Sequence, residues 1–347
     1  MDLIALDAQF HHERQCLRSF FRGISRSRNG QQSLGAMWLF LYSFYCCWHG
    51  TPDAVSLRKP KLGDNEMAKP GPITVCVINL KGGVGKSTIT ALLSRYAFNS
   101  RGKDVLAIDL DPQANLSQGL MHQSYSTFIA QQGGTIVEVF NDFLPPKPGS
   151  GGTQPLTADA VTELILESGD RRLDLIPSRF DFSDALTNAV RPDPRILAKF
   201  LSKNFKSKDL ILIDCAPTES VFTTAAYHAS DYVLIPVRPE FFATIGFPLL
   251  AESLANFQRR NKAHAIEVAG VVINNAFYHG GNDGGPEKAR AMASIKQECA
   301  THGWHIFSKQ MYHSRGYPKL MRGDYRYSGD ANLFWTFAQE FFDHIGL

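Results

Sequence analysis

The sequence predicts an α/β fold in which a doubly wound, mostly parallel sheet carries helices on both faces. Three observations support this prediction. From Ile73 onward, short runs rich in β-branched residues alternate with longer segments of helical pattern, which is the order expected of parallel strands with crossover helices. Most of the short runs are continuously apolar, as strands covered on both faces are. The 347 residues, of which 44% are hydrophobic, are enough to bury a substantial core.

The expected strands follow one another along the chain with helical segments between them. They are 73–79, 104–110, 173–178, 210–215, 232–237, 268–274 and 304–309. Two segments are too rich in glycine and proline to continue regular structure, so we expect loops at 144–155 and 278–286. A last helix is expected at 330–345, because its apolar residues recur at helical spacing and would dock on the core: Leu333, Phe334, Phe337, Phe341, Phe342 and Ile345.

Residues 1–66 differ from the rest of the chain. An arginine-dotted segment, 14–28, precedes the apolar run Leu34–Trp48. A helix of that length would span about 22 Å of a hydrocarbon core of about 30 Å, so no stable membrane insertion is expected. The run also lies too deep for a signal peptide. We expect 1–66 to be an N-terminal extension, either disordered or the product of too early a start before Met67, with a genuine tail or membrane-contact segment as the alternative. Residues 67–347 then form a single domain.

Composition narrows the class of protein further. The formal net charge of +3 does not by itself require a nucleic acid partner, although it is compatible with a local basic patch. The cysteines form neither a C-x-x-C pair nor a zinc-ligand cluster, and they lie at positions 16, 46, 47, 76, 215 and 299. Scattered cysteines of this kind are typical of buried thiols in a reducing compartment. We therefore predict a cytoplasmic protein without structural metal or disulfides.

A glycine-rich turn between the strand 73–79 and a helical segment has the residues of a phosphate cradle. Gly82, Gly83 and Gly85 let the backbone turn tightly, so that successive N–H groups can point at phosphate oxygens. Lys86 supplies a cation for the β and γ phosphates and Ser87 a hydroxyl for Mg²⁺, while the helix that begins near Ser87 adds its positive end. Strand, glycines, Lys-Ser-Thr and helix occur in the required order, so the sequence predicts a nucleoside triphosphate site.

Carboxylates end two of the other predicted strands. Asp109 and Asp111 follow one hydrophobic strand, and Asp214 follows another. Since Asp109 and Asp111 are two positions apart, they face the same side in an extended chain. A single aspartate at a strand end is usually a turn residue or a cap. Three of them alongside a phosphate cradle favour a site for a metal ion and for the attacking water.

Four stretches together resemble the ParA/MinD family of P-loop ATPases with a deviant Walker A motif, and most closely its ParA/Soj-type DNA partition branch. They are KGGVGKST (81–88), DLDPQANLSQGL (109–120), LILIDCAPT (210–218) and YVLIPVRPEFFATIGFPLL (232–250). Leu80 stands where an ordinary cradle has its opening glycine, and Lys81 resembles the family's extra lysine. The resemblance implies a P-loop NTPase fold that binds ATP and Mg²⁺ and acts as a weak Mg-dependent ATPase.

The resemblance also implies a role for each matching residue. Lys86 would hold phosphate within its own chain, whereas Lys81 would reach the partner's phosphates in an ATP-dependent homodimer. Asp111 would position or activate the hydrolytic water. The implied metal residues are Ser87, Asp109 and Asp214. The implied nucleotide contacts are Gly82, Gly83, Val84, Gly85, Lys86, Ser87, Thr88 and, at the adenine, Asn274 or Asn275.

The sequence also discriminates among the branches of this family. A membrane-positioning member would end in a lysine-rich amphipathic helix, but here no Lys or Arg follows Arg326, and the last segment carries Glu340 and Asp343. A metallocluster carrier would need paired cysteines, and Cys215 has no C-x-x-C companion. The tyrosines that a tyrosine-kinase branch would place at the terminus precede the last helix. The DNA partition branch therefore fits best.

The partition branch implies a dimer that binds DNA nonspecifically, associates with the nucleoid and responds to a ParB-like partner. Such proteins neutralise phosphates with basic residues. The candidates here are Arg259, Arg260, Lys262, Lys288, Arg290, Arg315, Lys319, Arg322 and Arg326. The segment 308–329 matches the family's proline-containing stretch only loosely. The loops 144–155 and 278–286 motivate an alternative, an ATP-switched positioning or regulatory protein for a non-DNA cargo.

Overall fold

The computed structural model describes residues 71–144, 152–180, 182, 193–240, 243–274, 285–312, 314–325 and 328–347. The chain divides into two compact units, Met1–Glu66 and Met67–Leu347, and all of the described residues belong to the second. The segment before Met67, with its apolar run Leu34–Trp48, lies outside them, so its nature stays a prediction. None of the helices in the described ranges combines the length and the apolar character that crossing a bilayer requires.

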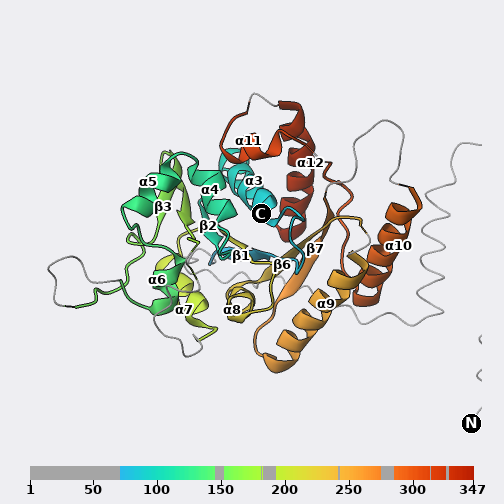
Figure 1. The fold of residues 1–347 in the computed structure, drawn as a ribbon, viewed down its shortest axis with the longest axis horizontal. Coiled ribbons are helices and arrows are strands. Elements are labelled where there is room, and N and C mark those ends of the chain that lie inside the picture. Colours follow the sequence, from blue (N-terminus) through green and yellow to red (C-terminus); the bar gives the residue numbers. More distant parts are fainter. Residues whose placement is uncertain are drawn as a thin grey trace, which may run out of the picture. The chain divides into compact units, whose positions relative to one another are not determined.

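The strands of the described residues form one seven-stranded sheet in the order β3-β4-β2-β5-β1-β6-β7 (Figure 1). Every neighbouring pair is parallel except β3 and β4, which are antiparallel. The chain leaves β1 for β2 on one side and later fills the other side with β6 and β7. The carboxyl end of β1 therefore lies at a switch point, where such folds bind ligands. The strands are β1 Ile73–Val77, β2 Val105–Asp109, β3 Glu163–Ser168, β4 Arg171–Ile176, β5 Leu210–Asp214, β6 Tyr232–Val237 and β7 Glu267–Ile273.

Six of the predicted strands are confirmed to within two residues at each end, and the doubly wound α/β fold is confirmed with them. The predicted strand 304–309 is reduced to a single parallel bridge between Ile306 and Val271, although hydrogen bonds from Val271 N to His305 O and from Phe307 N to Val271 O still hold it along β7. The sequence prediction missed β3. This edge strand reads ELILES and is half exposed, so it lacks the continuous apolar run that marks the buried strands.

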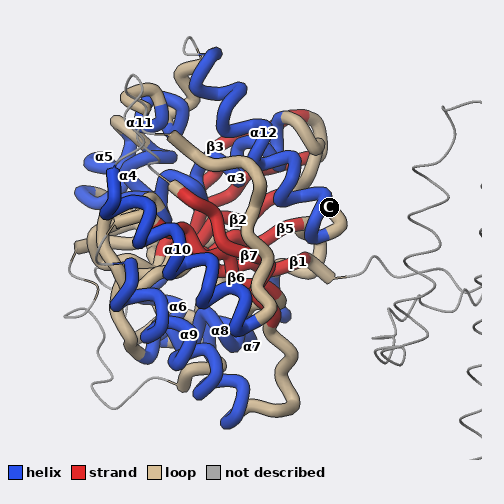
Figure 2. The backbone as a smooth tube through the Cα atoms, turned by 90° about the vertical axis from the view of Figure 1, so that its right-hand side faces the viewer, coloured by secondary structure: helices blue, strands red, loops and turns tan. Residues whose placement is uncertain are grey.

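Helices cover both faces of the sheet, and the strand residues alternate between two hydrophobic clusters (Figure 2). Val75 and Val77 of β1 point into the first cluster, whereas Cys76 and Ile78 belong to the second. The helices of the first cluster are α3 Lys86–Asn99, α4 Asn115–Met121, α5 Ser124–Ala130, α11 Tyr317–Met321 and α12 Ser328–Ile345. Those of the second are α6 Ile136–Asn141, α7 Ile196–Asn204, α8 Val221–Ala229, α9 Ala243–Arg260 and α10 Gly285–His302.

The predicted C-terminal helix is confirmed as α12. Its phenylalanines and Ile345 are buried in the first cluster, as expected, whereas Leu333 is 39% exposed and does not contribute. The predicted loop 144–155 is closed by an antiparallel bridge between Leu144 and Gln154. The predicted loop 278–286 ends earlier than expected, because α10 begins at Gly285. Residues 145–151 and 278–284 of these loops lie outside the described ranges. The cysteines of the described part, at 76, 215 and 299, are free and buried.

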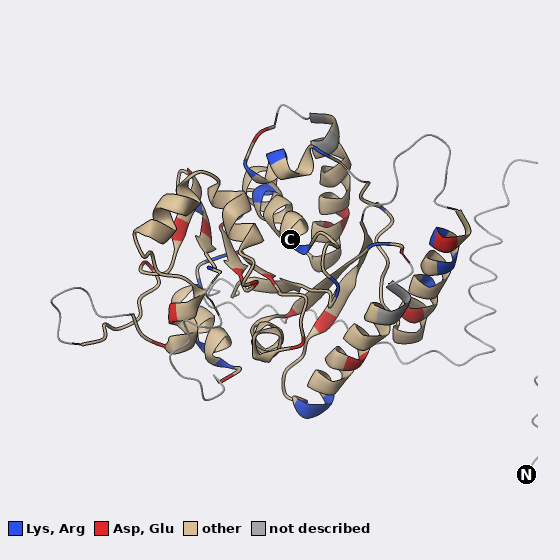
Figure 3. Cartoon of the chain, in the orientation of Figure 1, with Lys and Arg blue, Asp and Glu red and all other residues tan. Residues whose placement is uncertain are grey.

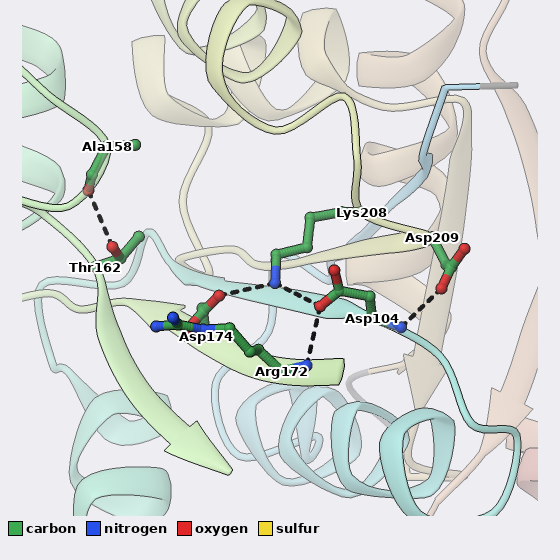
Figure 4. A network of polar contacts seen from close by, with 7 residues as sticks. All are labelled: Asp104, Ala158, Thr162, Arg172, Asp174, Lys208 and Asp209. Carbon is green, nitrogen blue, oxygen red and sulfur yellow. Dashed lines mark hydrogen bonds and ion pairs between the residues drawn. The ribbon is translucent and has the colours of Figure 1, made fainter. Parts of the chain in front are cut away.

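A buried lysine joins three strands at the amino-terminal edge of the sheet (Figure 4). Lys208 Nζ lies 2.7 Å from Asp104 Oδ1 and 2.7 Å from Asp174 Oδ2. Asp209 accepts a hydrogen bond from the Asp104 backbone N–H, and Asp104 accepts one from the Arg172 N–H. The network fixes the starts of β2, β4 and β5 relative to one another. The opposite ends of β2 and β5 carry Asp109 and Asp214, so their register is set in part here.

Candidate active site

The glycine-rich turn joins β1 to α3 at the carboxyl edge of the sheet. Gly83 and Gly85 have φ of 73° and 94°, which L side chains rarely adopt, so glycine is needed at both positions. Gly85 caps α3 without a side-chain hydrogen bond to the first turn. The first N–H groups of α3 therefore remain available to an anion, as the cradle requires. Val84, between the two glycines, is buried and anchors the turn.

Two side chains from the segments that follow β6 and β7 donate hydrogen bonds to carbonyls of this turn. Asn274, which follows β7, donates from Nδ2 to the Val84 carbonyl at 2.7 Å. Arg238, which follows β6, donates from its guanidinium to the Gly83 carbonyl at 3.4 Å. A Cβ on Gly85 would lie 2.1 Å from Asn274 Nδ2, so a side chain at this position would displace the amide. The turn is thus hydrogen-bonded to the residues that follow β6 and β7.

Lys86 is the buried cation of the site. The residue is only 6% exposed, and its Nζ donates to the Lys81 carbonyl at 3.3 Å. Burial lowers the pKa of Lys86, while the carboxylates of Asp214 and Asp111 act in the opposite direction. The structure therefore places the predicted phosphate lysine and two of the predicted aspartates in one electrostatic group. A lysine that is bonded within the turn and flanked by acids is already oriented for a phosphate.

Asp109 and Asp214 lie side by side, because they are register partners at the ends of β2 and β5. Both carboxylate oxygens of Asp109 accept hydrogen bonds: Oδ1 from Asp111 N, and Oδ2 from the N–H and hydroxyl of Ser117. Burial raises the pKa of Asp109 to about 7, although these three hydrogen bonds act to lower it. Asp109 thus fixes the start of α4 and the loop that carries Asp111, which is a positioning role in addition to the predicted metal role.

Asp214 is placed differently. It is fully buried, and neither carboxylate oxygen has a hydrogen-bond partner of ordinary geometry within the described part of the chain, although the Ser87 hydroxyl lies close enough to lower the pKa of Asp214. Burial, followed by the neighbouring Asp109, raises the pKa of Asp214 well above its usual range, while the Ser87 hydroxyl and Lys86 act against this rise. Buried carboxylate oxygens without partners need a cation or an ordered water. Ser87 and Asp214 therefore fit a hard cation such as Mg²⁺, which takes few protein ligands beside waters and phosphate oxygens.

Asp111 lies in the loop between β2 and α4. It is 6% exposed, and its Oδ1 accepts a hydrogen bond from Gln113 N at 2.9 Å. The Ala114 N–H donates to the Asp111 carbonyl, and Ala114 has a left-handed backbone with φ of 53°. A non-glycine residue in this region carries strain of the order of 1 kcal/mol, which the surrounding hydrogen bonds have to offset. The loop is therefore held in one conformation around Asp111.

Lys81 is engaged within its own chain. Its Nζ lies 2.7 Å from Glu240 Oε2, and Glu240 Oε1 lies 2.6 Å from the Arg238 guanidinium. The side chains of Lys81 and Glu240 are 25% and 29% exposed, so water reaches this ion pair. The sequence prediction did not single out Arg238 or Glu240. Both lie in the VRPE stretch directly after β6, and their position at the carboxyl end of a buried strand is the signal that would have found them.

The other predicted contacts are placed as follows. Thr88 lies half-buried in the first turn of α3, and Gly82 is exposed in the turn. Asn274 contacts the turn as described above, and its contact with adenine stays a prediction. Asn275 and Arg326 lie outside the described residues.

The predicted DNA-binding residues do not form one surface. Arg259, Arg260 and Lys262 are exposed at the end of α9, whereas Lys288 and Arg290 lie near the start of α10. The basic end of α9 and the basic start of α10 are at different ends of this helix pair (Figure 3). The remaining described candidates border α11 on the other face of the sheet, with Arg315 and Arg322 exposed and Lys319 half-buried.

Sequence comparison with protein families and with curated proteins also identifies relatives that are ATPases. The family model AAA_31, an AAA domain, matches residues 73–267. An uncharacterized protein of Methanocaldococcus jannaschii, MJECL24, is 29% identical over 205 residues, which are 58% of this chain and 73% of that protein. The chromosome-partitioning ATPase Soj of Treponema pallidum is 30% identical over 202 residues, 58% of this chain and 70% of Soj. Other relatives are spanned less fully, with 54% coverage of protein IncC of Escherichia coli.

Solved structures share the fold at lower sequence identity. The complex of a single-residue variant of Cyanothece McdA with ATP superposes with a TM-score of 0.64 at 20% identity and covers 80% of this chain and 98% of McdA. The pNOB8 ParA bound to nonspecific DNA superposes with a TM-score of 0.58 at 17% identity, covering 79% of this chain and 99% of ParA. Both likenesses concern the arrangement of sheet and helices.

Proposed function

Because this chain belongs to the ParA/MinD family of P-loop ATPases, we propose that it is a partition ATPase: a weak Mg-dependent enzyme that dimerises with ATP and binds DNA nonspecifically to segregate a plasmid or chromosome. One observation carries the ATPase part of this proposal. The buried Lys86, the glycine turn and the aspartates of β2 and β5 meet at one edge of the sheet. These are the parts that phosphoryl transfer to water requires.

The residues of the chain have separate roles in this reaction. The N–H groups of the turn and of the first turn of α3 bind the phosphates, and Lys86 neutralises their charge. Ser87 and Asp214 would hold Mg²⁺, which when bound neutralises charge on the β and γ phosphates. Asp111 orients the attacking water, and Asp109 holds the loop of Asp111 in place by accepting hydrogen bonds from the Asp111 N–H and from Ser117. The weak rate expected of the family follows from the lack of a further cation until a second subunit arrives.

Lys81 would supply that further cation in the dimer. In the single chain its ammonium group is neutralised by Glu240, so it acts on a partner's phosphates only after this ion pair is exchanged. ATP binding would then be linked to assembly, because the phosphates provide the new partner for Lys81. A ParB-like protein would stimulate hydrolysis by favouring the dimer.

DNA binding is the part of the proposal that distinguishes this protein from other switches of the family. The exposed basic residues of α9, α10 and the α11 region supply phosphate contacts. Structural likeness to pNOB8 ParA, solved with nonspecific DNA, supports this choice. Because contacts to phosphate release counterions, binding is expected to fall steeply as the salt concentration rises.

The experiment compares wild type with Lys86→Ala in two assays, ATP hydrolysis and retention of a random DNA duplex with ATP, ADP or no nucleotide. The proposal expects slow hydrolysis by wild type, ATP-dependent and salt-sensitive DNA retention, and the loss of both in Lys86→Ala. Hydrolysis at the wild-type rate in Lys86→Ala would contradict the site. DNA retention that ignores ATP would contradict the partition role.

A second candidate function follows from the separation of the basic residues over two faces of the sheet. A protein that positions a non-DNA cargo needs the same ATP switch without a continuous DNA-binding surface. An Asp111→Ala protein, trapped before hydrolysis, separates the two functions in a pull-down with ATP. Enrichment of one cargo protein without DNA favours the second candidate, and salt-sensitive retention of DNA favours the first.

A further inference from the structure

We propose that Arg238 and Asn274 are positioning residues that set the phosphate-binding turn in its binding conformation before the nucleotide arrives. This inference rests on the proposed function of the turn as an ATP phosphate site and adds two residues to it. Neither residue needs to touch the nucleotide. Each binds a backbone carbonyl of the turn and thereby directs the next backbone N–H to the opposite side, where the phosphates are proposed to bind.

The geometry of the peptide unit makes this connection. In a planar trans peptide the carbonyl of one residue and the N–H of the next point in opposite directions. Arg238 binds the Gly83 carbonyl, so the Val84 N–H is turned away from Arg238. Asn274 binds the Val84 carbonyl, so the Gly85 N–H is turned away from Asn274. Two consecutive N–H groups that face the same concave side form an anion-binding nest.

Both positioning residues are themselves held by the sheet. The Asn274 N–H donates to the Val237 carbonyl at 2.8 Å, which continues the pairing of β6 with β7 past their ends. Arg238 is the residue after Val237, and its guanidinium is also bonded to Glu240 at 2.6 Å. The turn is therefore tied to β6 and β7, although it is joined covalently to β1 and α3. A site on rigid elements keeps its geometry better than one on a loop.

Gly85 and Asn274 fit each other. The left-handed backbone at Gly85 already disfavours a side chain, and any Cβ there would lie 2.1 Å from Asn274 Nδ2. The amide thus occupies the space that the missing side chain leaves, and from there it reaches the Val84 carbonyl. The corresponding Cβ on Gly83 would lie 3.9 Å from the Arg238 guanidinium, an ordinary contact. Glycine at 85 therefore serves the hydrogen bond of Asn274 as well as the backbone conformation.

The test measures binding of ATP and of inorganic tripolyphosphate, which has no base, in the presence of Mg²⁺. Arg238→Met and Asn274→Leu keep the size of each side chain and remove its donors. Asn274→Leu is expected to weaken the binding of both ligands by about tenfold, the value of one well-placed hydrogen bond to the turn. Arg238→Met, which removes a longer bond of 3.4 Å, is expected to weaken the binding of both by about threefold. Arg238→Lys keeps a charged donor and is expected to recover most of the affinity. Arg195→Met, an exposed arginine at the start of α7, is the matched control and should bind as wild type does.

Tripolyphosphate separates this role from the adenine contact expected for Asn274. If Asn274 acts through the turn, Asn274→Leu weakens ATP and tripolyphosphate by the same factor. If it acts through the base, only ATP is weakened, and the inference is overturned for Asn274. Equal affinities of wild type and Arg238→Met, or no recovery in Arg238→Lys, overturn it for Arg238. Should Asn274→Leu fail to fold, Asn274→Ala, which also lacks the amide donor and adds no charge beside the phosphates, takes its place.

The same data keep this inference apart from the proposed function. If wild type binds neither ATP nor tripolyphosphate, the ATP site itself is wrong. If wild type binds both and the variants bind equally well, the ATP site stands and the positioning role fails. Melting temperatures of all variants are measured alongside, because a purely structural role would lower the melting temperature without changing the affinity of the folded protein.

Discussion

Replacing Lys208 by Met tests how much the network at the amino-terminal edge contributes to stability. Removal of one partner from a buried ion pair typically costs about 3–5 kcal/mol, because a charge is left buried without its counterion. Lys208 has 6% of its side chain exposed and is bonded to two carboxylates, of which Asp174 is 9% and Asp104 is 22% exposed. Asp174 retains Arg172 at 3.2 Å, and Asp104 retains the Arg172 N–H. We therefore expect a loss near the lower limit, about 3 kcal/mol.

The assay is equilibrium unfolding in urea followed by circular dichroism, with a thermal melt as a second measurement. For a domain of this size, a loss of about 3 kcal/mol corresponds to a decrease in melting temperature of roughly 6–12 °C. Lys199→Met is the matched control. Lys199 also lies 2.7 Å from a carboxylate, that of Asp193, but the two side chains are 68% and 47% exposed. An exposed pair of this kind contributes about 0–1 kcal/mol.

The two lysine variants differ in burial and in the number of carboxylates that each lysine contacts, whereas the N–O distances of all three ion pairs are equal at 2.7 Å. A loss below about 1 kcal/mol in Lys208→Met, or equal losses in both variants, would refute the reasoning. Because the network lies at the edge opposite the phosphate-binding turn, ATP affinity at a temperature where Lys208→Met is folded should match that of wild type.

Three further predictions concern the site. Lys86→Ala is expected to lose ATP binding in titration calorimetry, because the buried phosphate cation is removed. Lys81→Ala should keep ATP binding and lose ATP-dependent dimerisation in sedimentation velocity. Dimers of Lys81→Ala in the presence of ATP would contradict the role of Lys81 at the partner's phosphates. Glu240→Gln removes an ion pair with Lys81 worth about 1 kcal/mol, so ATP-dependent dimerisation should strengthen about fivefold. Unchanged or weaker dimerisation would show that the ion pair between Lys81 and Glu240 does not compete with dimerisation. Ser117→Ala removes the hydroxyl that donates to Asp109 and that accepts from the buried Ser178 N–H. The free energy of unfolding, measured by urea titration, should therefore fall by about 2 kcal/mol. A loss within error would show that these bonds are dispensable.

The sequence predicted those parts of the site whose residues lie close together along the chain or at the ends of recognisable strands. The turn, Lys86 and Ser87 lie within a few residues between a strand and a helix, and parallel strands bring the aspartates that end them to one edge of the sheet. The partners of these residues were not predictable in the same way. Lys81 and Glu240 are 159 positions apart, and Val84 and Asn274 are 190 apart. Such contacts depend on the strand order, and no local pattern of the sequence specifies it.

The same limit explains the misjudged elements. The strand β3 lies at an edge with half-exposed side chains, so burial imposes no continuous apolar run on its sequence. The segment 304–309 has the apolar residues of a strand, but Ile306 alone pairs with β7, while Phe307 covers Gly270. In the sequence Lys208 resembles the surface lysines around it. Only the fold places the carboxylates of Asp104 and Asp174, near the starts of β2 and β4, beside it. In each case the structure of the segment or the burial of the side chain depends on packing against elements that are distant in sequence.

The two cations near the phosphate-binding turn differ in a way that suits a switch. Lys86 is buried and bonded within the turn, so it belongs to the rigid part of the site together with the carbonyls held by Arg238 and Asn274. Lys81 is partly exposed and paired with the Glu240 carboxylate, an interaction worth about 1 kcal/mol that the phosphates of an arriving nucleotide can replace. A contact that must be exchanged in every cycle has to be weak, whereas one that selects phosphate has to be fixed in advance. The division between a rigid turn and a replaceable ion pair therefore allows binding and assembly to be separate steps.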